Sequence, residues 1–161
     1  MESPKKRKNP SLKKIGWKEV IDLPEWGVQS LLAKADTGAR GSAIDVTQIE
    51  RVSESKVKFK VVLDRKDRAN GREVVAKVLR SSRVRSSNGE VQERFVVRTP
   101  MQIGDDIHEV DFSLVNRKQM ICRVLLGRLA LAGHFLVDSD AKYLHGPRKK
   151  PRTSNKKKLK T

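Results

Sequence analysis

The sequence has a single cysteine among its 161 residues, so no disulfide bond can form within the chain. Cys122 lies in the apolar run MICRVLL, which predicts a small buried hydrophobe. One unpaired cysteine is typical of proteins that work in a reducing compartment. The sequence is therefore unlike the disulfide-rich domains of secreted proteins.

Long apolar runs are also missing. No stretch approaches the roughly 18 apolar residues that a membrane-spanning helix needs. The first residues lack the apolar segment of a signal peptide. We expect a soluble cytoplasmic protein that does not interact with membranes.

Motifs that bind cofactors or metals are absent as well. The sequence contains no G-x-x-x-x-G-K-[ST] phosphate loop, no H-E-x-x-H, no C-x-x-C and no G-x-S-x-G serine elbow. The three histidines, His108, His134 and His145, are spread singly, and an isolated histidine is more often structural than a ligand. The sequence predicts no cofactor and no metal site.

Positive charge is abundant, but it gathers at the two ends. The formal net charge is +17, of which residues 1–14 carry +5 and residues 148–161 carry +8. Both ends have almost nothing apolar to bury, so we predict disordered basic tails around one domain at 15–147. The simpler interpretation of the tails is solubility and loose attraction to polyanions. The other is weak docking on RNA or a ribosome by phosphate neutralisation.

The region between the tails has the pattern of an all-β protein. Apolar residues alternate with period two over Lys56–Leu63 and Arg72–Leu79. Turn signals stand at 86–89 (SSNG) and 104–106 (GDD). Only residues around 125–135 have apolar spacing that permits a short helix. The pattern predicts a small antiparallel barrel or sandwich.

The stretch AKADTGARGSAID at 33–45 interrupts this alternation with Asp36-Thr37-Gly38. Such a turn is either an ordinary Asx-turn or the loop of a catalytic carboxylate. Two carboxylates that share one proton can hydrolyse a peptide, because one activates water while the other hydrogen-bonds the carbonyl oxygen. A hydroxyl that locks the loop and a glycine that lets backbone amides approach suit the second interpretation.

A later block favours the catalytic interpretation. AKADTGA is followed much later by VLLGRLAL, and this order resembles the retropepsin-like aspartic proteases. The wider sequence is similar to a prokaryotic family usually labelled "ATP-dependent zinc protease", found near ATP-grasp ligases that add glutamates to proteins. The resemblance covers about residues 15–144. Its four blocks are 15–27, 33–44, 86–99 and 114–138.

The resemblance implies a small closed antiparallel β barrel of retropepsin type with one short C-terminal helix. It implies that Asp36 is the catalytic carboxylate. Because the chain has one such aspartate, it also implies a homodimer with the site on its two-fold axis. The residues that shape or support the catalytic loop would be Thr37, Gly38, Ala39, Gly127 and Arg128.

Two positions depart from the family pattern. Gly41 stands where a hydroxyl residue is expected, and Asp45 where a residue such as histidine is expected. Asp45 lies nine residues beyond Asp36 on an alternating strand, so it is not the second carboxylate of the pair.

The hairpin turned by residues 86–89 has the place of the flap of retropepsin-like proteins, which would cover the cleft and exclude water. Strand alternation puts Arg83 and Arg85 on one face. The hairpin is either an ordinary solvated one or a recognition element for acidic peptides, since guanidinium groups pair with carboxylates. On the second interpretation the substrate-binding residues are Arg40, Arg83, Arg85, Ser86 and Asn88.

Three hypotheses about function follow. The leading one is an aspartic endopeptidase, active as a homodimer, whose substrate is a peptide or protein. If the hairpin is a recognition element, this substrate is acidic or glutamate-rich. The second is a non-catalytic β-barrel adaptor that binds RNA or a ribosome through its basic tails. The third, implied by the family label, is a metal-dependent hydrolase.

Overall fold

The computed structural model describes residues 12–145, and nearly all regular structure in this range is strand. A 3₁₀ turn, η1, spans Pro24–Trp26, and one short helix, α1, spans Arg128–Leu131. The strands are β1 (Lys13–Leu23), β2 (Val28–Ala35), β3 (Ser42–Arg51), β4 (Lys56–Val62), β5 (Gly71–Lys77), β6 (Arg80–Arg85), β7 (Val91–Ile103), β8 (Asp106–Val115), β9 (Val124–Leu126) and β10 (Phe135–Lys142).

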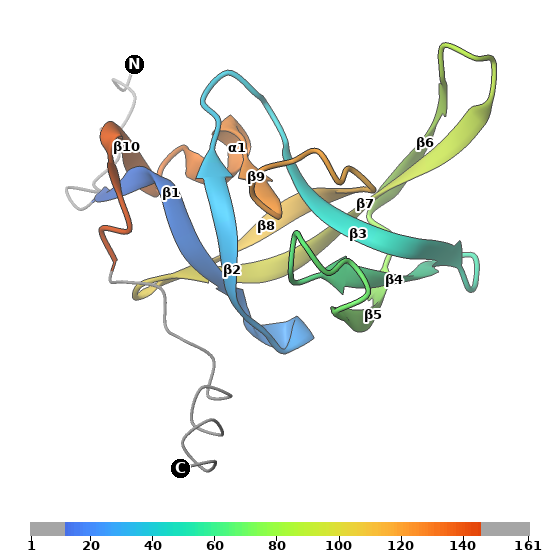
Figure 1. Cartoon of the computed structure of the whole chain (residues 1–161), viewed down its shortest axis with the longest axis horizontal. Coiled ribbons are helices and arrows are strands. Elements are labelled where there is room, and N and C mark those ends of the chain that lie inside the picture. The colour runs from blue at the N-terminus through green and yellow to red at the C-terminus, as the bar shows by residue number, and fades with distance from the viewer. Residues whose placement is uncertain (1–11, 146–161) are drawn as a thin grey trace, which may run out of the picture.

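Six of these strands close into a barrel (Figure 1). The pairing runs β1–β2–β9–β3–β8–β7 and returns to β1, where Asp22 lies opposite Gln102. The remaining strands extend this barrel: β10 pairs with β1, the β4–β5 hairpin pairs with β3, and β6 pairs with β7. The predicted all-β barrel with one short helix is confirmed.

The sequence predicted an antiparallel barrel, but the barrel contains both parallel and antiparallel strand pairs. Strands joined by hairpins pair antiparallel, as in β4–β5 and β7–β8. β2–β9 and β3–β8 pair parallel, as does β10 on β1 outside the ring. For the β2–β9 pair, the reason is the position of β9, which inserts between β2 and β3. These two strands run in opposite directions, so β9 must be parallel to one and antiparallel to the other.

The hairpins form where alternation and turn residues predicted them. On β4, Val57, Phe59 and Val61 are buried, while the lysines between them remain partly exposed. The β6–β7 turn ends at Gly89 with φ +90°, a backbone conformation that glycine adopts without steric cost. These local signals therefore gave the correct strand boundaries to within about two residues.

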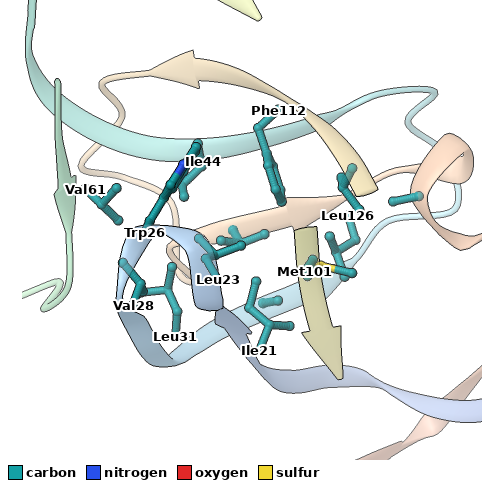
Figure 2. Close-up of a cluster of buried hydrophobic side chains, with 14 of the residues drawn as sticks. Ile21, Leu23, Trp26, Val28, Leu31, Ile44, Val61, Met101, Phe112 and Leu126 are labelled. Carbon is teal, nitrogen blue, oxygen red and sulfur yellow. The ribbon is translucent and has the colours of Figure 1, made fainter. Parts of the chain in front are cut away.

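The core fills the barrel with side chains from both early and late strands (Figure 2). Trp26, from η1, contacts the edge of Phe59 with ring centroids 5.2 Å apart. Phe112, from β8, and Leu126, from β9, are also almost completely buried. Cys122 is buried and free, as predicted, and burial raises the pKa of its thiol, which disfavours the reactive thiolate.

The predicted basic tails lie almost entirely outside the described residues. β1 begins at Lys13, so Lys13 and Lys14, which we had placed in the N-terminal tail, pair with Phe135 and Leu136 of β10. Lysine suits this role because its backbone joins the ladder while its side chain reaches solvent. Within residues 12–145, the structure has no helix of the length and apolar character required to span a membrane.

Candidate active site

Asp36 stands at the point where β2 ends, and its backbone and side chain start a tight loop. Its N–H donates to the carbonyl of Leu126 (2.8 Å), which ties the end of β2 to β9. Its Oδ1 accepts from the N–H of Gly38 (2.9 Å), and its carbonyl accepts from the N–H of Ala39 (3.2 Å). The local geometry is therefore an Asx-turn, but one attached to a second segment of the chain.

That second segment is the junction of β9 and α1, which braces the loop from the other side. The N–H of Arg128 donates to the carbonyl of Ala39 (2.8 Å), and the guanidinium Nη1 of Arg128 donates to the carbonyl of Thr37 (3.1 Å). The N–H of Leu129 donates to the carbonyl of Arg40 (3.0 Å). These hydrogen bonds fix the backbone on both sides of Gly38, so Asp36 stands on a rigid turn.

Gly127 permits this close approach. A Cβ at this position would lie 2.2 Å from the carbonyl oxygen of Gly41 and 2.9 Å from that of Ala39. The N–H of Gly127 donates to the hydroxyl of Ser42 (3.0 Å), a buried contact for which no sequence motif exists. The packing of one backbone on another therefore requires glycine at this position.

Gly127→Ala is expected to destabilise the protein by about 1–3 kcal/mol, because the methyl group would force two backbone segments apart. The measurement is the free energy of unfolding in urea. Gly41→Ala is the matched control. A Cβ built at Gly41 has no heavy atom of another residue within 4 Å beyond its chain neighbours, and the backbone φ of Gly41 is not in the left-handed region. Equal stability of the two variants would contradict the assigned packing.

The loop presents its polar groups outward. Thr37, Gly38 and Arg40 are exposed, and Asp36 is half-buried. Within the described chain, the Oδ2 of Asp36 has no hydrogen-bond partner and no ion pair involves this carboxylate. Leu129, on α1 beside the loop, is an apolar side chain that remains 58% exposed. One copy of the chain thus offers a single preorganised carboxylate on an accessible surface.

The hairpin residues predicted to bind substrate do not meet this loop within one chain. Every residue of β6 is exposed, and the hairpin tip projects away from the barrel, apart from the β2–β3 loop (Figure 1). Arg85 donates to the carbonyl of Gly89 (3.2 Å), while the hydroxyl of Ser86 bonds Asn88 and closes the turn. Arg83 lies opposite Glu93 in the strand register. The substrate-binding role of these hairpin residues stays a prediction.

The three histidines are spread singly along the sequence, but two of them meet in the structure. His108 and His134 stack with ring centroids 3.5 Å apart and planes at 7°. The Nδ1 of His108 lies 2.7 Å from Asp106 Oδ2, and the Nδ1 of His134 lies 3.6 Å from Asp106 Oδ1. These three side chains form the one group in the described chain with donor atoms close enough to hold a metal ion. They meet because α1 brings His134 back to β8, which sequence spacing does not show.

The stacking of the two rings does not suit a shared metal ion. The lone pair of each ring nitrogen lies in the ring plane, so two parallel planes stacked 3.5 Å apart cannot both contain one ion. The Nε2 of His108 also faces the carbonyl of Ala130 on α1 (2.9 Å). This arrangement fits a hydrogen-bonded support that holds α1 against β8, behind the loop of Asp36.

Asp45, which departs from the family pattern, forms a second polar cluster. Its carboxylate is completely buried and accepts from Arg68 at 2.5 and 2.9 Å, from the guanidinium of Arg123, and from the N–H of Arg117 at 3.1 Å. Burial lowers the pKa of the Arg123 guanidinium, and the charge of Asp45 opposes this shift. The hydrogen bond to Asp45 raises the pKa of Arg68. Asp45 therefore ties β3 to two loops.

Comparison with known proteins adds to this geometry. A family model described as retropepsin-like aspartic endopeptidase RimB matches residues 14–148. The chain belongs to this RimB-like family. A crystal structure of a Legionella pneumophila protein of unknown function has the same fold, with a TM-score of 0.69 at 22% identity, over 84% of this chain and 99% of that one.

Relatives of this RimB-like chain include longer proteins with another name. A "Probable alpha-L-glutamate ligase" of Shewanella halifaxensis is 33% identical over 135 residues, and one of Desulfotalea psychrophila is 32% identical over 127 residues. The matches cover 82% and 77% of this chain, but only 30% and 27% of those proteins. The chain thus spans less than a third of the length of these curated relatives.

Proposed function

We propose that the protein is an aspartic endopeptidase that works as a homodimer and hydrolyses acidic, glutamate-rich peptides. The observation that carries the proposal is the loop of Asp36, whose backbone is fixed by the β9–α1 junction and whose half-buried carboxylate accepts from the N–H of Gly38. Membership of the RimB-like family supports the same reaction class.

The reaction requires two carboxylates, and each chain supplies one. In the homodimer, ionised Asp36 takes a proton from water, whose oxygen attacks the peptide carbonyl carbon. The protonated carboxyl of the partner subunit's Asp36 gives its proton to the carbonyl oxygen. The tetrahedral intermediate then collapses: Asp36, now protonated, gives its proton to the amide nitrogen, while the partner subunit's Asp36, now ionised, takes a proton from a hydroxyl of the intermediate. The C–N bond breaks, and an amine and a carboxylic acid are released. Close approach of the two carboxylates keeps one of them protonated, because both cannot ionise side by side.

Exposure of the loop supports the dimer. A two-fold axis brings the same surface of both copies together, so a residue near the axis meets its own counterpart. Asp36 lies on such an accessible surface, and the exposed Leu129 beside it offers apolar area that an interface would bury. The pairing of the aspartates would then complete a site that one chain leaves incomplete.

The charge of the chain and the names of its relatives support an acidic substrate. Arginine side chains bind carboxylates through two parallel hydrogen bonds. Arg40 is exposed directly after the catalytic turn, and Arg83 and Arg85 are exposed on the hairpin. The relatives named as alpha-L-glutamate ligases contain this domain within a longer chain. A peptidase with this specificity would break the kind of bond that a glutamate ligase forms.

The proposal is tested with a panel of peptides of equal length that are rich in glutamate, neutral or rich in lysine. We expect cleavage of the glutamate-rich peptides only, at a rate that EDTA leaves unchanged, since the catalytic residue is a carboxylate. Products are identified by mass spectrometry. Loss of cleavage with EDTA, restored by added zinc, would instead support the metal-dependent hydrolase.

A non-catalytic adaptor is the second candidate. The relatives named as ligases match only over this domain, so in those proteins it is one module of a larger chain. The basic tails that would bind RNA or a ribosome lie outside the described residues. Binding of glutamate-rich peptide without cleavage, by both wild type and Asp36→Asn, would favour this candidate.

A further inference from the structure

A groove of about 880 Å³ lies between the far end of β3, the base of the β6–β7 hairpin and the loop after β8. Apolar side chains of Phe95, Leu114 and Val115 form part of its lining and are buried. Exposed amide side chains, including Gln48 and Gln92, stand around them. The groove therefore combines an apolar floor with a polar rim.

Three cations in this groove have no ionic partner among residues 12–145. Arg94 is half-buried, and Arg117 and Lys118 are exposed. The fourth cation, Arg51, is already neutralised, because it donates to Glu93 at 2.7 Å. Glu93 is the one acidic residue of the lining, so the groove keeps an excess of three positive charges available to a ligand.

The loop that carries two of these cations is anchored from below. The N–H of Arg117 donates to the buried carboxylate of Asp45 (3.1 Å), and Asn116 accepts from Arg68 (2.8 Å). Arg117 is exposed, and its guanidinium has no hydrogen-bond or ionic partner in the described part of the chain. The backbone of the binding loop is thus preorganised, which lowers the entropy cost of holding a charged ligand.

Strand β3 connects the groove to the proposed catalytic loop. β3 begins at Ser42, six residues after Asp36, and its far end at Gln48–Arg51 forms one wall of the groove. At about 3.3 Å per residue, this strand carries the wall roughly 20 Å from the catalytic loop. An extended peptide needs about six residues to cover the same distance.

We propose that this groove is a distal specificity site that binds glutamate side chains of an extended acidic substrate about six residues from the bond that is cleaved. Arg94, Arg117 and Lys118 pair with the carboxylates, and the apolar floor packs against the CH₂ groups of the same side chains. The inference rests on the proposed peptidase function and adds the substrate length and the residues that select it. A two-fold axis through the paired aspartates places one such groove on each side.

The test compares the double variant Arg117→Ala/Lys118→Ala with Arg65→Ala/Lys66→Ala. The control removes the same pair of charges from another exposed loop, outside the groove. With oligoglutamate peptides of about twelve residues, we expect the groove variant to raise KM about tenfold at unchanged kcat. With peptides of about five residues, neither variant should change KM. A KM that both variants raise equally, or that neither raises, would overturn the proposal.

Binding to a protein that cannot cleave separates this inference from the proposed function. The binding of a labelled twelve-residue oligoglutamate is measured by fluorescence anisotropy with the full chain carrying Asp36→Asn. Affinity should be about tenfold weaker when the same chain also carries Arg117→Ala/Lys118→Ala. This result is expected whether or not wild type cleaves. A single-stranded oligonucleotide of equal charge is the second probe. Equal weakening for the oligonucleotide would show a general polyanion site and would overturn a site for glutamate side chains.

Discussion

Asp36→Asn is expected to lower the rate of peptide cleavage by about 10³-fold or more and to leave the fold unchanged. The amide oxygen of Asn can still accept the hydrogen bond from Gly38, so the loop keeps its geometry. The amide cannot take a proton from water, so both roles of the carboxylate pair are lost in the homodimer. The measurement is initial rate on a glutamate-rich peptide, with the thermal unfolding midpoint recorded for both proteins.

The control for this substitution is Asp105→Asn, which makes the same chemical change at an exposed aspartate in the β7–β8 turn. It should cleave like wild type. Equal rates for Asp36→Asn and Asp105→Asn would remove Asp36 from the mechanism, and the peptidase would need another catalytic group.

Asp45→Ala is expected to cause the largest loss of stability, about 3–5 kcal/mol. The substitution leaves Arg123, which is 3% exposed, without its buried counter-charge, and it also removes the acceptor for Arg68 and for the N–H of Arg117. A buried cation without a partner is far more costly than the loss of a surface ion pair. The free energy of unfolding in urea measures this effect.

Two further variants give this prediction its controls. Asp105→Ala removes an exposed carboxylate and should change the free energy of unfolding by less than about 0.5 kcal/mol. Asp45→Leu combined with Arg123→Met replaces the buried pair by apolar side chains and should recover part of the stability lost in Asp45→Ala, since the more deeply buried of the two cations is then no longer present. If Asp45→Ala were as stable as wild type, the Arg123 side chain would have to reach solvent without cost, and the prediction would be wrong.

The hairpins were predictable from sequence because their signals are local. Alternation in β4 and β5 and the turn at 86–89 involve neighbouring residues, and the pleat of a strand converts such alternation directly into a buried and an exposed face. The catalytic loop was found in a different way. Asp36 and Gly127 stand 91 residues apart, and only the family resemblance linked them before the structure showed their segments in contact.

The features that the sequence analysis missed are contacts between distant residues. β9 has three residues, too few for a periodic signal, yet it closes the barrel between β2 and β3. Asp106 and His108 meet His134 only because α1 turns the chain back. A partial signal existed for Asp45 and Arg123, since each is a charge inside an apolar run. Opposite charges in such settings predict a buried pair, although not which residues pair.

The central claim is that two copies of Asp36 act together, and mixed dimers test it most directly. Two differently tagged copies are co-expressed, one of them with Asp36→Asn, and the heterodimer is isolated through both tags. If the carboxylates share one proton, the heterodimer should be as inactive as the homodimer of Asp36→Asn. A heterodimer with half of the wild-type rate would show that each chain works alone, and would contradict the account.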